Sequence, residues 1–136
     1  MALLDTTLLV DLMKEVKRRR PGPATAKLED LERRDEVLRI AIFTIGELYI
    51  GVTKGRDSAL ERRAVENCLQ LFEVVPFDES TARVFGTIVG DLERQGNVIS
   101  DMDALIASVA LEQDELLVTR NVKHFQRVAG LRVEGH

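Results

Sequence analysis

The chain has 136 residues and a mass of 15.3 kDa, and 45% of its residues are hydrophobic. This size is typical of one domain, and the hydrophobic share excludes an intrinsically disordered chain. The net charge of −4 and the pI near 5.3 exclude a protein that binds nucleic acid through an overall positive field. We therefore expect a single domain over residues 1–136, in which any phosphate-binding surface is local.

The single cysteine, Cys68, excludes a fold held by internal disulfides and favours a reducing compartment. No apolar stretch approaches the roughly 20 residues of a membrane span, and the first residues lack the features of a signal peptide. We expect a cytoplasmic protein without a membrane partner.

Short apolar runs alternate with helical patterns along the chain. The runs predict strands at 1–4, 37–42, 72–76 and 116–119, with a possible fifth at 131–133. One helix is expected directly after residue 5, and others at 24–34, 44–52, 57–71, 78–94 and 101–113. In the helix 57–71 the pattern predicts a buried stripe of Leu60, Ala64, Cys68 and Leu71.

The predicted strands are too short and too apolar for a half-exposed sheet. Strands of this kind that alternate with helices indicate an α/β fold with a mostly parallel central sheet of four to five strands, covered by helices on both faces. The expected architecture therefore has three layers, α/β/α.

Acidic residues lie where predicted strands lead into helices. Asp5 follows the first strand, Glu47 lies in the first turn of the helix after the second, and Asp101 and Asp103 open the helix before the fourth. Ligands bind at the carboxyl edge of an open parallel sheet, so these positions can meet. Crowded carboxylates repel one another unless a cation lies among them, and their hard oxygens favour magnesium or manganese.

Helix capping is the alternative explanation for each acid. Thr44 to Glu47 spells a capping box, and Ser100 to Asp103 is a similar signature. Helix N-termini attract acidic residues in any case. The functional interpretation depends on the coincidence that three acidic helix starts can reach one edge of the sheet.

Other site chemistries have less support. One cysteine and two histidines, His124 and His136, do not make a zinc site, and no glycine-rich phosphate loop is present. We expect His124 to pack in a loop or to face a phosphate. A phosphatase with Asp5 as nucleophile would need a second acid two residues later, where the chain has Thr7.

Four blocks of sequence, in this order and at this length, resemble the PIN-domain ribonucleases, and among them the VapC-type toxins of toxin–antitoxin pairs. The likeness covers almost the whole chain. The blocks are Leu4–Asp11, then Thr44–Leu48 with Gly51, then Asp103–Ala107, and finally Leu117–Asn121 with His124, Phe125, Gly130 and Leu131.

The resemblance implies that Asp5, Glu47 and Asp103 are catalytic acids that bind metal. Asp101 is expected either as a further metal ligand or as a helix N-cap. Asn121 occupies the fourth acidic position of some PIN nucleases, and Thr7 replaces the usual asparagine. Residues expected to support the metal or to contact phosphate are Thr6, Thr119, Arg120, Asn121 and Lys123.

The implied activity is that of an endoribonuclease toxin. One or two Mg²⁺ ions, or Mn²⁺, would activate a water molecule that hydrolyses an RNA phosphodiester bond. Local basic groups would bind the RNA, and Arg127 is expected among those near the site. A second candidate is a basic cluster at one helix end, for which a solvated surface without RNA contact is the alternative interpretation. This cluster consists of Lys14, Lys17, Arg18, Arg19 and Arg20.

The resemblance also implies a homodimer and a cognate VapB-type antitoxin. The antitoxin would lie in a groove and insert an arginine among the carboxylates. Leu28, Leu31, Tyr49 and Ile50 are available for such a contact, although they are equally expected in the core. The competing functional hypothesis is a catalytically silent PIN-like module that binds RNA or protein.

Overall fold

The computed structural model describes residues 1–136 and contains one sheet of five strands in the order β3-β2-β1-β4-β5. Every neighbouring pair is parallel, and Leu3 of β1 is in register with Arg39 of β2 and Leu117 of β4. The α/β class and the mostly parallel sheet are thus confirmed. The strands are β1 (Ala2–Leu4), β2 (Leu38–Ala41), β3 (Glu73–Val75), β4 (Leu116–Val118) and β5 (Val133–Glu134).

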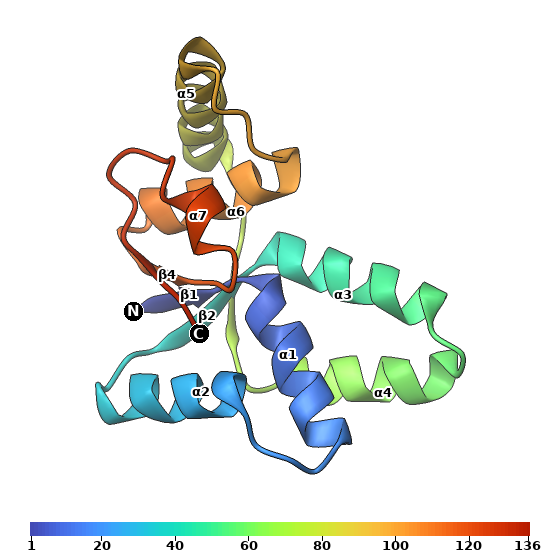
Figure 1. Cartoon of the computed structure of the whole chain (residues 1–136). Coiled ribbons are helices and arrows are strands. Elements are labelled where there is room, and N and C mark those ends of the chain that lie inside the picture. Colours follow the sequence, from blue (N-terminus) through green and yellow to red (C-terminus); the bar gives the residue numbers. More distant parts are fainter.

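Helices cover both faces of the sheet, which gives the three predicted layers (Figure 1). Side chains alternate along a strand, so Leu4 of β1 enters one core while Leu3 enters the other. The core around Leu4 is covered by α1 (Thr6–Lys17), α2 (Pro23–Arg33), α3 (Ile42–Lys54) and α4 (Ser58–Leu69). The core around Leu3 is covered by α5 (Glu79–Gln95), α6 (Asp101–Glu112) and α7 (Val122–Phe125).

The strand order places β1 in the middle of the sheet, between β2 and β4. All three strands end at the same edge because they are parallel, and β1 and β2 lead directly into α1 and α3. This carboxyl edge, next to the reversal of strand order at β1, is where α/β sheets of this kind bind ligands.

Helix α3 begins at Ile42 rather than at the predicted Thr44, and Ala41 at its N-cap position offers no side-chain bond. Glu47 therefore lies in the second turn, and the capping-box interpretation of Thr44 and Glu47 is wrong. The reason is that the apolar residues Ile42 and Phe43, which resemble a strand in sequence, are already helical.

The predicted stripe of α4 is wrong in part. Val65 and Cys68 are buried, but Leu60 is 54% and Leu71 65% exposed, and Ala64 is exposed as well. The helix buries one narrow face against α3, with which it forms a pair that projects beyond the sheet (Figure 1). No helix of the structure is both long enough and apolar enough to cross a membrane.

Candidate active site

Asp5 follows β1 directly and is almost fully buried, with 2% of its surface exposed. Its main-chain N–H donates to the carbonyl of Val118 at 2.9 Å, which ties it to the end of β4. Its Oδ2 accepts hydrogen bonds from Thr7 at 2.9 Å and Thr119 at 2.7 Å. Although Asp5 occupies the N-cap position of α1, its side chain caps no main-chain N–H. The hydroxyl groups of Thr7, in α1, and of Thr119, after β4, therefore hold the carboxylate in place.

Glu47 reaches the same edge from the second turn of α3. The hydroxyl of Thr6 lies 2.6 Å from Oε1 of Glu47 as its donor, and it is also hydrogen-bonded to the hydroxyl of Thr44 at 3.0 Å. Both threonines are buried, so this contact fixes α3 against the start of α1. Thr6, which was predicted to support the metal site, thus positions Glu47, the second of the three acids in chain order.

Asp103 and Asp101 share the first turn of α6 but have different surroundings. Ser100 is the N-cap, and its hydroxyl oxygen accepts the main-chain N–H of Asp103 at 3.1 Å, so the interpretation of Asp101 as the cap is wrong. The Asp103 side chain is 19% exposed, and its Oδ2 lies 3.3 Å from Nδ1 of His124. Asp101 is exposed and forms no ion pair.

The electrostatics of the site couple Asp5, Glu47 and Asp103. Burial raises the pKa of Asp5, and the hydroxyl bonds lower it by less, while the charge of Asp103 adds a further rise. Burial also raises the pKa of Glu47, with Asp5 and Asp103 contributing repulsion that the Thr6 bond does not cancel. Three coupled carboxylates without a lysine or arginine partner suit a cation.

The donor set consists of hard oxygens of the kind that Mg²⁺ and Mn²⁺ bind. No three or more side chains of His, Cys, Asp or Glu form a group that could hold a metal ion by themselves. The chemistry of these donors suits Mg²⁺, which usually keeps several water ligands and is bound by only one or two carboxylates together with substrate phosphates.

The remaining predicted site residues lie around β4 and α7. Thr119 is buried, and besides bonding Asp5 it accepts the main-chain N–H of Asn121 at 3.0 Å. Asn121 takes the N-cap position of α7 without using its side chain for capping. Lys123 is exposed and forms no ion pair, whereas Arg120 pairs with Asp11 at 2.7 Å.

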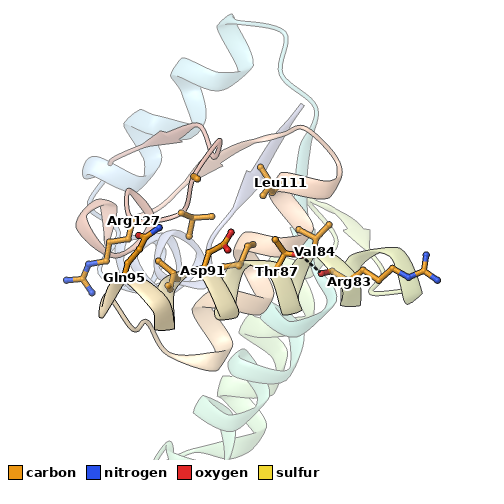
Figure 2. A pocket seen from close by; sticks show the side chains of 11 residues that line it. Arg83, Val84, Thr87, Asp91, Gln95, Leu111 and Arg127 are labelled. Atoms are coloured by element: carbon orange, nitrogen blue, oxygen red, sulfur yellow. Dashed lines mark hydrogen bonds between the residues drawn. The ribbon is translucent and has the colours of Figure 1, made fainter.

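Arg127, predicted beside the site, lines a different pocket of about 330 Å³ (Figure 2). This pocket lies between α5, α6 and the residues that follow α7, and none of the three acids lines it. Nη1 of Arg127 donates to the carbonyl of Val98 at 3.2 Å. The turn after α7 thus directs the Arg127 side chain toward α5 and Val98, and no hydrogen bond or ion pair joins Arg127 to the three acids.

A larger groove of about 700 Å³ begins beside Glu47 and runs between α1, α3 and α4. Leu60, Leu71 and Val16, all more than half exposed, lie along it. Its polar lining includes Lys14, Lys17, Glu61, Arg63 and Asn67. The stretch of α4 that the helical pattern had assigned to the core thus forms an open apolar wall.

The four residues predicted for this groove do not line it. Leu31 is fully buried, and Leu28 and Tyr49 pack against the same core, as the alternative interpretation had it. Ile50 is 52% exposed but faces elsewhere.

Sequence reasoning missed two residues next to the site, Asp11 and His136. Asp11 binds both Arg120 and His136. The spacing of four residues from Thr7 to Asp11 put both on one face of α1 and was a usable signal. Nothing in the sequence pointed to His136, which lies 125 positions from Asp11.

Comparison with known proteins places the chain in a family. The PIN domain family matches residues 2–131. Ribonuclease VapC2 of Haemophilus influenzae is 30% identical over 97% of this chain and 95% of its own length, and the tRNA(fMet)-specific endonuclease VapC of Shigella flexneri is 28% identical over the same shares. The solved structure of VapBC2 from Rickettsia felis, bound to a DNA fragment from its promoter, superposes with a TM-score of 0.89 at 27% identity, covering 99% of this chain and 98% of that one.

These matches extend over nearly the whole chain and agree with the parallel five-stranded sheet and with the acids at its carboxyl edge. The chain belongs to the PIN-domain family, and within it to the VapC ribonucleases.

Proposed function

We propose that the chain is the endoribonuclease toxin of a VapBC-type pair and that it hydrolyses RNA phosphodiester bonds with the help of a divalent cation. One observation carries the proposal: Asp5, Glu47 and Asp103 lie near one another at the carboxyl edge of the sheet, the pKa values of Asp5 and Glu47 are raised, and no lysine or arginine pairs with any of the three, Asp103 having only His124 at 3.3 Å. A silent binding module has no use for this repulsion.

Asp5, Glu47 and Asp103 would hold Mg²⁺ or Mn²⁺, as one or two ions. When bound, such an ion supplies a water molecule of lowered pKa and neutralises charge on the phosphate. Thr7 and Thr119 keep Asp5 oriented, and Thr6 does the same for Glu47. Asp101 stays a prediction as an additional ligand, since its exposed side chain lies in the same helical turn as Asp103, two residues before it.

On the substrate side, Asn121 and Lys123 stand at the start of α7, next to Thr119. Lys123 has no ion pair, and its free ammonium group suits a phosphate of the RNA strand. The neutral Asn121 would bind a water molecule or a phosphate oxygen instead of adding a fourth negative charge.

The groove between α1, α3 and α4 suits the antitoxin. Several of the solved relatives are toxin–antitoxin complexes, among them VapBC from Salmonella typhimurium, with a TM-score of 0.87. The groove exposes apolar side chains and opens next to Glu47, so a partner segment lying in it can direct a basic side chain to the acids. An arginine there would compensate their charge and displace the metal. The homodimer stays a prediction.

The test is cleavage of mixed transfer and ribosomal RNA by the purified protein with Mg²⁺, with Mn²⁺ and with EDTA. We expect cleavage that EDTA and the substitution Asp5→Asn both abolish. Asp35→Asn is the matched control, because Asp35 is exposed and has no ion pair. Equal RNA binding by wild type and Asp5→Asn, with no cleavage by either, would contradict the proposal and support the silent module.

A further inference from the structure

Arg120 lies along one face of α1, beside the acidic cluster. Its main-chain N–H donates to the hydroxyl of Thr7 at 3.1 Å, and Thr7 in turn donates to Asp5. One helical turn further, Nη1 of Arg120 donates to both carboxylate oxygens of Asp11, at 2.7 and 3.0 Å. The residue thus spans Thr7 and Asp11, and its guanidinium is held at a fixed distance along the helix from the buried carboxylate.

The guanidinium keeps donors for a ligand. Only Nη1 is engaged, and 53% of the Arg120 side chain is exposed. A guanidinium carries five N–H groups in a planar fork that matches phosphate oxygens. The donors on Nε and Nη2 form no hydrogen bond within the chain and are available to an RNA phosphate.

Asp11 is itself held from its other side. Nε2 of His136 lies 3.0 Å from Oδ2 of Asp11, and only 2% of the His136 side chain is exposed. Its other ring nitrogen, Nδ1, is buried without a partner. The segment after β5 therefore returns to α1 and fixes the carboxylate that fixes Arg120. A pair on an open surface would instead leave both side chains mobile.

We propose that Asp11 and His136 are positioning residues that hold Arg120 as a clamp for an RNA phosphate next to the scissile one. The inference rests on the proposed nuclease function and deepens it. A long side chain held in one orientation loses less freedom on binding than a mobile one, so the clamp acts mainly on substrate affinity.

The same contacts allow the opposite role, in which Asp11 only neutralises Arg120 and competes with RNA. The two roles predict opposite effects of Asp11→Asn. If Asp11 positions the clamp, the substitution weakens RNA binding. If Asp11 competes with RNA, the substitution frees a positive charge, tightens binding and steepens its salt dependence.

The experiment measures two quantities for wild type, Asp11→Asn, His136→Ala, Arg120→Gln and the double variant Asp11→Asn/Arg120→Gln. The first is the Kd for fluorescently labelled unfractionated transfer RNA in EDTA at several salt concentrations. Phosphate contacts are independent of sequence, so a mixed RNA pool is a suitable probe. The second is kcat and apparent KM for cleavage of the RNA pool that the wild type cuts.

We expect Arg120→Gln to raise Kd and KM several-fold, to change kcat little, and to reduce the salt slope by about 0.7–0.9, the range for the loss of one phosphate contact. Asp11→Asn should raise Kd and KM in the same direction, and His136→Ala should do so less. In the double variant the Asp11 substitution should add nothing to Arg120→Gln, since there is no clamp left to position.

Asp114→Asn is the matched control, because Asp114 forms an exposed ion pair with Arg132 outside this network. Tighter RNA binding by Asp11→Asn, or equal effects of that substitution with and without Arg120, would overturn the inference. If wild type cuts RNA and Asp11→Asn cuts it with an unchanged KM, only the clamp fails. If wild type neither binds nor cuts RNA, the nuclease proposal fails together with it.

Discussion

At the residue scale, the buried carboxylate of Asp5 lowers the stability of the metal-free protein. Burial is the largest cause of its raised pKa, and the hydroxyl bonds from Thr119 and Thr7 offset that cause only in part. A raised pKa means that the folded state binds the proton more tightly than the unfolded state. Stability is therefore lost as the pH rises from the ordinary carboxyl range through the folded pKa. If the proposed metal binds at neutral pH, we expect it to recover part of this loss.

The substitution Asp5→Asn tests this opposition between function and stability. In EDTA at neutral pH we expect the variant to melt a few degrees above wild type, because a neutral amide avoids the cost of a buried charge. The difference should shrink at acidic pH, where wild-type Asp5 is protonated. Thermal melting at several pH values, with and without Mn²⁺, measures both effects.

Mn²⁺ should raise the Tm of wild type and leave that of Asp5→Asn nearly unchanged. Asp35→Asn, at an exposed position, should behave like wild type in every condition. A variant that melts below wild type at neutral pH without metal would show that the hydroxyl bonds to Asp5 stabilise the fold more than its buried charge destabilises it.

At the scale of elements, α3 and α4 show what an apolar pattern can establish. The pattern predicted that both helices exist, since a run of apolar residues at helical spacing must be buried against something. It did not reveal which side of α4 meets α3, because Leu60, Ala64 and Leu71 are as apolar as the buried Val65. Nothing within the chain covers the remaining side, and only the folded structure shows that side as open.

The exposed wall of α4 yields a prediction about the antitoxin. Leu60→Glu should keep the fold and the ribonuclease activity, since Leu60 is 54% exposed, and should weaken antitoxin binding by about tenfold or more through loss of apolar contact and a buried charge. Co-purification and a binding isotherm with the antitoxin measure this effect. Val98→Glu, at a 66% exposed position outside the groove, is the control. Equal loss of antitoxin binding in both variants would show that the groove is not the antitoxin site.

At the scale of the whole molecule, the carboxyl edge of the sheet was more predictable than the connections across it. Asp5 and Glu47 were predicted at this edge because they follow parallel strands, and Asp103 because it opens the helix that runs back to the start of β4. Long-range polar contacts have no comparable rule. Two such contacts join segments whose sequences show no periodic relation. One is the contact between Asp11 and His136, and the other is the cap that the Glu15 carboxylate provides for the N-terminus of α2 by accepting the main-chain N–H groups of Gly22, Ala24 and Thr25.

The opposite edge of the sheet contains a buried ion pair. Nε of Arg39, on β2, lies 3.1 Å from Oε1 of Glu115, which precedes β4, and the Glu115 side chain is fully buried. Burial is the main reason why the pKa of Glu115 is raised, and Arg39 lowers it by less. The carboxylate accepts no well-formed hydrogen bond. Its buried charge is therefore compensated mainly by Arg39, and the loss of Arg39 alone would leave it largely uncompensated.

Removing one partner should therefore cost far more than removing both. We expect Arg39→Met alone to lower the free energy of unfolding by about 3–5 kcal/mol, because an uncompensated carboxylate stays buried. Arg39→Met combined with Glu115→Leu should recover most of that loss, as apolar packing replaces the pair.

Urea unfolding of the single and double variants measures the coupling between the two residues. RNA cleavage by the folded double variant should match wild type, since the pair lies at the edge of the sheet away from Asp5. A double variant as unstable as the sum of its singles would mean that Arg39 stabilises the sheet through its contacts with Gln113 and Met1 instead of through Glu115.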